Sequence, residues 1–322
     1  MSPPATTPAK LYSCQCDEGK PGSQKRTQPR TRFQPVPQFM TPTREGIEKL
    51  LRFIAAHPRL VVLTGAGASA ESGIPTYRDH QGNWQHSAPV TQQAFTGSER
   101  SRCRYWQRSF NGWPNVRDAR PNAAHLALAT MERLGIIQLL ITQNVDRLHQ
   151  RAGSTRVVDL HGRLDRVACL ACGRLSTRDT LQRELMLLGY TTLRQPGPAK
   201  PDGDAALDTD ASPERGIPHC ARCQGTLMPD VVFFGGVVPA DRVAACRSAL
   251  ADADALLVVG SSLQVYSGFR FCRLARSMDK PIALLNPGLT RADAIASLKI
   301  EAPCARVLRG AVNRLCDSHA TR

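Results

Sequence analysis

Two polar runs in this chain carry the side chains best suited to catalysis. The run Thr142-Gln-Asn-Val-Asp146 and the pair His161-Gly162 each follow a short apolar stretch. Histidine titrates near neutral pH and can therefore act as a general base, whereas the plainer alternative is a surface histidine beside a glycine. The side-chain amides of Gln143 and Asn144 each offer two donors and one acceptor. These residues indicate a polar ligand site with one histidine that can move a proton.

A third run has the pattern of a phosphate-binding turn. The apolar residues 60–63 predict a buried strand, and Gly65-Ala-Gly-Ala-Ser-Ala70 fits the G-x-G-x-x-A form of a dinucleotide-binding turn. Gly65 would permit the turn, and Gly67 would let the backbone approach a pyrophosphate. Ala70 would allow close packing of a helix that starts near Ser69 and points its N–H groups at the phosphates. A tight turn without a ligand is the alternative.

The residues after this turn depart from an ordinary dinucleotide-binding unit. Such a unit places an acidic residue about 20 positions on. Here Ser72-Gly-Ile-Pro75 interrupts the pattern, and a polar segment follows at 78–85. We therefore expect the turn to open into a loop that folds over the cofactor.

Two C-x₂-C pairs indicate a metal site. Cys169 and Cys172 are separated by 47 residues from Cys220 and Cys223. Each pair brings two sulfurs to one ion, so the four thiolates predict one tetrahedral zinc ion. All four positions are filled, which makes the zinc structural and not catalytic; four unligated thiols are the alternative. We interpret residues 196–213, rich in proline, glycine and aspartate, as an insertion loop within this interval.

The elements that must position these groups alternate between strands and helices. Apolar runs that end in small or polar residues predict strands at 60–63, 136–141, 157–160, 231–234, 255–259 and 282–285. Helical segments separate most of them, which predicts an α/β fold with a doubly wound, Rossmann-like parallel sheet. Ligands bind beyond the carboxyl ends of such strands, so the polar runs should meet there.

Helix signals and composition divide the chain into parts. Thr43 is a plausible N-cap for a helix whose apolar residues lie between 47 and 54, and residues 122–133 predict a further helix that Gly135 stops. Aromatic and basic residues mix in a helical module at about 84–120. The expected domains are a disordered basic tail at 1–42, a Rossmann-like domain at 43–163 and 226–322, and a small zinc-binding domain at 164–225.

The composition is that of a globular, strongly basic chain. Of 322 residues, 42% are hydrophobic, and the net charge is +15. A solvated basic surface explains this charge better than nucleic-acid contact does. No apolar run approaches the roughly 20 residues of a membrane span, and no secretory signal is visible, so the eleven cysteines suit reduced thiols and a metal site. We expect a monomer in a bacterial cytoplasm, with the mitochondrial matrix as the alternative.

Taken in order, these motifs resemble those of the sirtuin family of NAD-dependent protein-lysine deacylases. The turn at 65–75, the runs at 142–146 and 161–162, the paired cysteines and Gly260-Ser-Ser262 have the same order in sirtuins. The resemblance covers about residues 45–308. Tyr105-Trp106 and the segments at 229–235 and 263–268 are similar to the class II branch, which includes the mitochondrial sirtuin with ADP-ribosyltransferase and lipoamidase activity. The resemblance implies NAD, one structural zinc ion, and acyl-lysine-bearing proteins as substrates.

The resemblance also implies roles for individual residues. In sirtuins the acyl-lysine oxygen displaces nicotinamide from NAD, and O-acyl-ADP-ribose is released. His161 corresponds to the general base that deprotonates a ribose hydroxyl, Gln143 to a ribose contact, and Asn144 and Asp146 to nicotinamide contacts. The implied cofactor set is Gly65, Ala66, Gly67, Ala68, Ser69, Ser72, Gly73, Ile74, Pro75, Tyr77, Arg78, Trp84, Gln143, Asn144, Val145, Asp146, Gly260, Ser261, Ser262, Asn286, Pro287, Gly288 and Cys304. The implied substrate set, around a peptide bound as an added strand, is Tyr105, Arg108, Val231, Phe233, Phe234, Gly235 and Val265.

The sequence departs from the family pattern at two positions. Gly236 stands where an acidic residue is usual, and Tyr77 stands where phenylalanine is more frequent. Tyr105 and Arg108 share a helix face, and in sirtuins that prefer acidic acyl chains such a pair holds the acyl carboxylate. The alternative is that Tyr105 packs in the core and Arg108 is solvated.

Other functions remain open from the sequence. Within the family, ADP-ribosyl transfer or removal of long or lipoyl chains could dominate. A hydride-transferring NAD dehydrogenase would lack the usual acidic ribose residue. A zinc-ribbon nucleic-acid binder fits the basic tail but leaves the NAD motifs unexplained.

Overall fold

The computed structural model describes residues 41–79, 81–85, 89–192, 200, 203 and 216–320. The expected tail at 1–42 and the insertion loop at 196–213 lie almost entirely outside these residues. Within them, no helix is both long enough and apolar enough to span a membrane.

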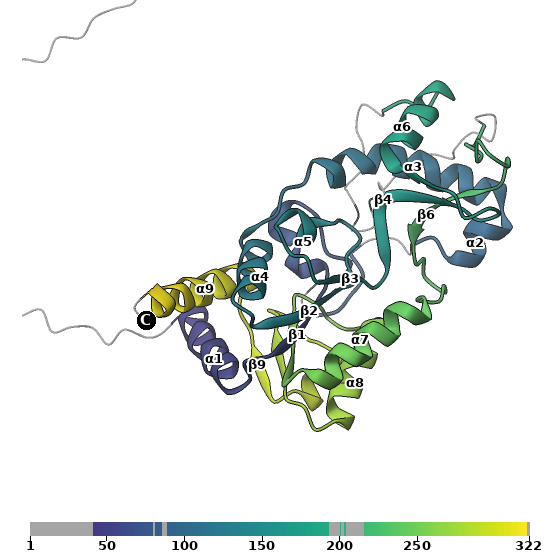
Figure 1. Cartoon of the computed structure of the whole chain (residues 1–322). Coiled ribbons are helices and arrows are strands. Elements are labelled where there is room, and N and C mark those ends of the chain that lie inside the picture. Colours follow the sequence, from purple (N-terminus) through teal and green to yellow (C-terminus); the bar gives the residue numbers. More distant parts are fainter. Residues whose placement is uncertain are drawn as a thin grey trace, which may run out of the picture. The chain divides into compact units, whose positions relative to one another are not determined.

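The larger of the two sheets in the described part of the chain is parallel throughout (Figure 1). Its strands lie in the order β3 (Val157–Asp159), β2 (Ile137–Thr142), β1 (Leu60–Thr64), β7 (Ala255–Val259), β8 (Ile282–Leu285) and β9 (Leu298–Ile300). The chain moves outward from β1 to β3 and later returns to β7 on the other side of β1. The strand order therefore reverses between β1 and β7, the point where open parallel sheets bind ligands. The predicted Rossmann-like sheet is confirmed.

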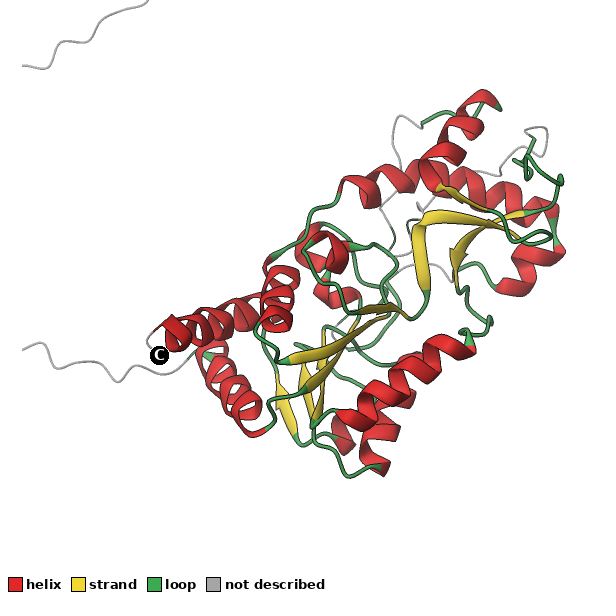
Figure 2. Cartoon of the chain, in the orientation of Figure 1, coloured by secondary structure: helices red, strands yellow, loops and turns green. Residues whose placement is uncertain are grey.

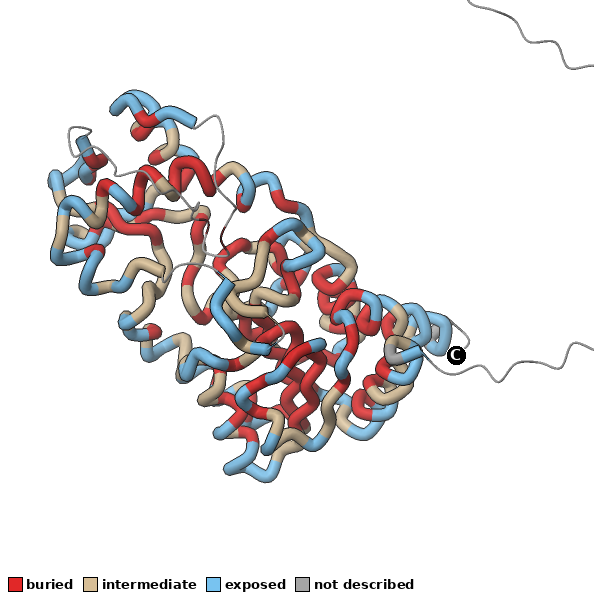
Figure 3. The backbone as a smooth tube through the Cα atoms, turned by 180° about the vertical axis from the view of Figure 1, so that it is seen from behind, coloured by how far each residue is buried: buried red, intermediate tan, exposed pale blue. Residues whose placement is uncertain are grey.

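Helices cover both faces of this sheet, which explains its continuous apolar strands. Leu60 and Val62 of β1 pack on one face with α1 (Pro42–Ala56), α4 (Ala123–Arg133) and α9 (Cys304–Ala320). The alternate residues Val61 and Leu63 pack on the other face with α7 (Ala240–Asp252) and α8 (Tyr266–Ser277). Both layers are visible in Figure 2, and Figure 3 shows that buried residues gather in the interior, with exposed residues around them.

A small antiparallel sheet carries the cysteine pairs. Strand β4 (Gly162–Cys169) lies between β5 (Leu175–Thr177) and β6 (Leu227–Val231). Helices α2 (Gln92–Gly97), α3 (Glu99–Asp118) and α6 (Arg178–Leu187) pack around it. Phe95 and Trp106 from the helical segment share one hydrophobic core with Val167 and Leu227 of this sheet. The inserted module and the cysteine segment are therefore stabilised together.

Three local predictions are wrong. The run 231–234 does not form a strand of the parallel sheet, because Val231 ends β6 and pairs with Gly162. The N-cap of α1 is Thr41, whose hydroxyl accepts from the backbone of Arg44, and Pro42 takes the first helical position that favours proline. The third wrong prediction is the helix expected to start near Ser69, which is described with the functional site below.

Candidate functional site

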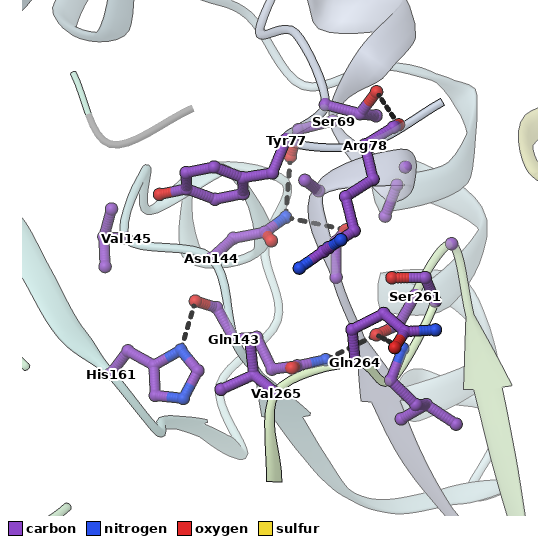
Figure 4. Close-up of a pocket in the computed structure, with 18 of the residues that line it drawn as sticks. Ser69, Tyr77, Arg78, Gln143, Asn144, Val145, His161, Ser261, Gln264 and Val265 are labelled. Atoms are coloured by element: carbon purple, nitrogen blue, oxygen red, sulfur yellow. Dashed lines mark hydrogen bonds between the residues drawn. The ribbon is translucent and has the colours of Figure 1, made fainter. Parts of the chain in front are cut away.

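A cavity of about 820 Å³ opens at the strand-order reversal (Figure 4). It is lined by the residues that follow β1, β2 and β7 and by the segments at 231–238 and 286–289. The predicted cofactor residues that line it are Gly65, Ala66, Gly67, Ala68, Ser69, Ile74, Tyr77, Arg78, Trp84, Gln143, Asn144, Val145, Asp146, Gly260, Ser261, Ser262, Asn286, Pro287, Gly288 and Cys304. The predicted substrate residues that line it are Tyr105, Val231, Phe233, Phe234, Gly235 and Val265. The predicted general base, His161, also lines it.

Four predicted residues are absent from the cavity wall in the described part of the chain: Ser72, Gly73, Pro75 and Arg108. The helix expected near Ser69 is replaced by two 3₁₀ turns, Ala66–Ala68 and Ala70–Ser72. Gly73 ends the second turn with a φ of 83°, a left-handed conformation that suits glycine. Ala70 is exposed and does not make the predicted helix–strand contact.

The glycines of the turn are required by a contact between two strand ends. Gly67 donates its N–H to the carbonyl of Gly260 at 2.8 Å. A Cβ on Gly67 would lie 2.9 Å from the Cα of Gly260, and one on Gly65 would lie 2.7 Å from the Cβ of Ser261. The turns after β1 and β7 thus touch through their backbones, which leaves a floor of small residues where a pyrophosphate can approach closely.

His161 follows β3 and is fixed through both ring nitrogens. Nδ1 lies 3.0 Å from the carbonyl oxygen of Gln143, and Nε2 lies 2.6 Å from Oγ of Ser267. A carbonyl can only accept, so Nδ1 carries the proton and Nε2 keeps its lone pair. Burial lowers the pKa of His161 to about 4. The imidazole is therefore neutral at pH 7 and ready to accept a proton at Nε2.

The polar run after β2 forms a network of hydrogen bonds with the turns after β1 and β7. Gln143 donates from Nε2 to Oγ of Ser261 at 2.7 Å, and Asn144 donates from Nδ2 to the carbonyl of Gly65 at 3.1 Å. Ser69 donates to a carboxylate oxygen of Asp146 at 2.7 Å. Burial raises the pKa of that carboxyl, and the Ser69 hydroxyl together with the Leu148 N–H opposes this. These bonds hold the amides in fixed orientations.

Two further histidines, which the sequence analysis did not predict as site residues, lie next to these residues. Nε2 of His125 is 3.3 Å from Oγ of Ser69, and Nε2 of His149 is 2.9 Å from Oγ1 of Thr64. Their rings are 4.7 Å apart. His125 also completes a capping box with Asn122 at the start of α4, and the Asn-x-x-His spacing is the signal that could have found it.

We expect acid pH to destabilise the fold through these histidines. Burial lowers the pKa of His125 and His161 to about 4 and lowers that of His149 well below its ordinary value. Their stabilising effect is complete above the unfolded pKa of about 6.5 and is lost as pH falls towards the folded pKa. At pH 5.5 each should cost about 1.4 kcal/mol, or about 4 kcal/mol together.

Urea unfolding at pH 7.5 and pH 5.5 measures this effect. Most carboxyls stay ionised in both states across this interval. His149→Gln should remove about a third of the pH dependence, because one of the three titrating groups is gone. A free energy of unfolding that does not change between the two pH values would contradict the assignment.

Aromatic contacts hold the segment after the turn across the cavity. The ring centroids of Tyr77 and Phe234 are 6.1 Å apart, and those of Tyr77 and Trp84 are 6.2 Å apart. The guanidinium of Arg78 stacks over the ring of Trp84 at 4.1 Å and donates to the carbonyl of Gly82. The described part of the 78–85 segment therefore contacts the cavity wall near Phe234 through aromatic rings. This position agrees with the expectation of a loop that folds over the cofactor.

Tyr105 and Arg108 occupy different environments on α3. Tyr105 is 3% exposed and packs edge-on against Phe95 and Phe233 at 5.3 and 5.2 Å. It reaches the cavity through this aromatic cluster. Arg108 is half-buried and does not line the cavity. The geometry fits the alternative in which Tyr105 is a packing residue.

The four predicted metal ligands meet at one point. The sulfur atoms of Cys169, Cys172, Cys220 and Cys223 all lie within 4.8 Å of one another. The backbone N–H groups of Cys172 and Ala171 hold the pKa of the Cys169 thiol down at about 6, which favours a thiolate. A Cβ on Gly225, two residues after Cys223, would lie 2.9 Å from the sulfur of Cys169, so only glycine fits this close to the cysteine cluster. Four sulfurs in this arrangement suit tetrahedral zinc.

Sequence comparisons agree with these features. The Sir2 family model matches residues 65–267. An NAD-dependent protein deacetylase of Xanthomonas campestris pv. campestris (strain 8004) is 53% identical over 264 residues, which cover 80% of this chain and 88% of that protein. The mitochondrial NAD-dependent protein lipoamidase sirtuin-4 of Bos taurus is 46% identical over 267 residues, which cover 82% of this chain and 85% of that protein.

Solved structures show the same fold. A complex of a Sir2 homolog with NAD has a TM-score of 0.65 at 31% identity, over 84% of this chain and 94% of that chain. A complex of Sir2 with a p53 peptide and NAD+ has a TM-score of 0.66 at 28% identity, over 86% of this chain and 99% of that chain.

Proposed function

The chain belongs to the Sir2 family, and we propose that it uses NAD to remove acyl groups from protein lysine side chains, releasing nicotinamide and O-acyl-ADP-ribose. One observation carries the proposal. His161 presents an unprotonated Nε2 in a cavity at the strand-order reversal, between a small-residue turn and the amides of Gln143 and Asn144. A neutral base beside residues that suit a dinucleotide can deprotonate a ribose hydroxyl.

The residues of the cavity suit NAD. The turns at Gly65–Gly67 and Gly260–Ser262 would hold the pyrophosphate and the adenosine ribose, because their small residues line the cavity. Asn144 and Asp146 would hold the carboxamide of nicotinamide. When bound, NAD supplies the electrophilic ribose carbon that the acyl oxygen attacks. His161 accepts the hydroxyl proton, and its Nδ1 bond to Gln143 keeps the ring oriented for that transfer.

The acyl-lysine would enter between the segments 231–235 and 264–268. Phe233, Phe234 and Val265 give the cavity apolar lining, and Val265 lies on an exposed segment. We also propose the domain division given above, with zinc stabilising the part that includes β4 and β6. A cytoplasmic location is a further proposal that only fractionation can test.

A second candidate activity is removal of lipoyl or other long acyl groups. The similarity to a lipoamidase and the apolar aromatic wall of a cavity of about 820 Å³ support it.

Incubation with NAD and a panel of acyl-lysine peptides tests the proposal. Mass spectrometry should show deacylated peptide together with equal amounts of nicotinamide and O-acyl-ADP-ribose. The ratio of acetyl to lipoyl turnover ranks the two candidates. Formation of reduced NAD, or no release of nicotinamide with any peptide, would overturn the proposal.

Arg108 provides a test of acyl specificity. Because it does not line the cavity, Arg108→Ala should change kcat/KM for acetyl-lysine and glutaryl-lysine peptides by the same factor. If its guanidinium did hold the acyl carboxylate, the glutaryl substrate alone would lose roughly 2 kcal/mol, about 30-fold. Measuring both peptides with the same enzyme preparation supplies the control.

A further inference from the structure

The general base has a hydrogen-bond partner that the roles above do not use. Oγ of Ser267 lies 2.6 Å from Nε2 of His161. Nδ1 of His161 donates to the carbonyl of Gln143, so in the neutral ring Nε2 can only accept. Ser267 must therefore donate its hydroxyl proton to Nε2. Figure 4 shows the His161 ring with one nitrogen bound to Gln143 and the other on the opposite side of the ring.

Ser267 is held by the fold and not by a loose loop. It is the second residue of α8, a twelve-residue helix. A Cβ on the next residue, Gly268, would lie 2.6 Å from the side-chain oxygen of Gln143, so the helix start packs directly on the residue that fixes His161. The same cavity wall includes Ser267, His161 and Gln143. The serine hydroxyl is thus positioned against the base and open to the substrate.

This arrangement raises a chemical difficulty for direct proton transfer. Nε2 has one lone pair, and the Ser267 hydroxyl occupies it at a short distance. A substrate hydroxyl can reach Nε2 only after that bond breaks. No such break is needed if the serine hydroxyl itself receives the substrate proton.

We propose that Ser267 relays the proton from the ribose hydroxyl of NAD to His161. In this step the Oγ–H bond of Ser267 breaks as an Nε2–H bond forms on His161. The substrate O–H bond breaks as a new Oγ–H bond forms, and its electron pair stays on the ribose oxygen, which becomes the nucleophile. Serine is regenerated, and the imidazole leaves the step as imidazolium. The inference rests on the proposed function, because it assigns a second residue to the same proton transfer.

Three variants test the relay. Ser267→Ala removes the hydroxyl, Ser267→Thr keeps it, and Ser277→Ala makes the same change at the exposed end of the same helix. Ser267→Ala should lower acyl removal about 100-fold, the size of one proton-transfer contribution, while exchange of labelled nicotinamide into NAD changes less than about twofold. The threonine variant should recover most of the rate, and Ser277→Ala should behave as wild type.

A second measurement does not depend on turnover. The Ser267 hydroxyl stabilises the neutral imidazole, so its loss should raise the pKa of His161 above about 4, while burial, the main cause of the lowered pKa, remains. NMR titration of the histidine ring nitrogens in the enzyme without NAD reads this directly. Wild-type acyl removal by Ser267→Ala would overturn the relay, and an unchanged His161 pKa would overturn the hydrogen bond itself. If wild-type enzyme deacylates no peptide, the proposed function fails, and the NMR titration still decides the hydrogen bond.

Discussion

Replacing His161 with alanine should abolish acyl removal while the protein stays folded and still binds NAD. The expected loss is about 1,000-fold or more, because a general base contributes roughly 10² to 10⁴ in rate. Binding of NAD should survive, since the small-residue turns and the amides of Gln143 and Asn144 do not depend on the imidazole for their contacts with each other. The first chemical step, release of nicotinamide, precedes the task of His161 and should be affected less.

The pH profile of the wild-type enzyme sharpens this prediction. The base is active when neutral, and its pKa is lowered to about 4 by burial. The rate kcat/KM should therefore stay level as pH falls from 8 to 6 and drop only near the folded pKa, where Nε2 gains a proton. Because acid also unfolds the protein, initial rates must be measured within the time for which the protein stays folded.

His57→Ala is the matched control. His57 caps the end of α1 and stacks edge-on against Phe53, away from the cavity wall. It should keep full activity. Deacylation by His161→Ala at a rate close to wild type would remove His161 from the mechanism, whereas loss of folding in that variant would be visible in its unfolding curve.

The sequence predicted the site best for the residues that directly follow the strands of the parallel sheet. The runs after β1, β2 and β7 could be assigned to one site because parallel strands end at the same edge of a sheet. That rule needs no knowledge of side-chain packing, and the residues it selected lie together on the cavity wall.

Predictions failed where a long-range contact decides the local structure. The run 231–234 has the same apolar character as the core strands, yet pairing of Leu227 with Cys169 commits this part of the chain to the antiparallel sheet. Periodicity in a short run cannot distinguish the two sheets. The contact that requires glycine in the phosphate turn was likewise outside the reach of the sequence, because the closest neighbours of Gly65 and Gly67 are Gly260 and Ser261, almost 200 residues away in the chain.

The polar site residues that the sequence did not reveal also depend on long-range contacts. His125 and His149 lie on helices among apolar neighbours, where a histidine is usually a core residue with satisfied hydrogen bonds. Their link to the site depends on Ser69 and Thr64, which belong to distant segments. Ser267 is likewise just one serine among many in the sequence, and only the fold places its hydroxyl against His161.

Loss of one zinc ligand should have the second-largest effect. Cys220→Ser leaves three of the four clustered thiols, and the protein should lose the single zinc ion per chain that we expect metal analysis of the wild type to find. Structural zinc contributes about 10–16 kcal/mol in small domains, which is comparable to the whole stability of a typical domain. The antiparallel sheet should therefore unfold in this variant.

The unfolding should extend beyond the two C-x₂-C pairs. Cys169 and Cys220 share a core with Tyr105 and Trp106 of α3, and Phe233 on the substrate wall packs against that core. Acyl removal should be lost although no cysteine of the cluster lines the cavity. Cys316→Ser changes an exposed cysteine on α9 and should alter neither zinc content nor activity.

Metal replacement separates a structural role from a catalytic one. Cobalt in the four-sulfur site should restore the fold and almost the full wild-type rate, because all ligand positions are taken by sulfur and none is open for substrate. A rate that changes strongly with the metal would show that the ion takes part in the reaction. A metal-free preparation that stays folded and active would show that the four thiols hold the small sheet together without an ion.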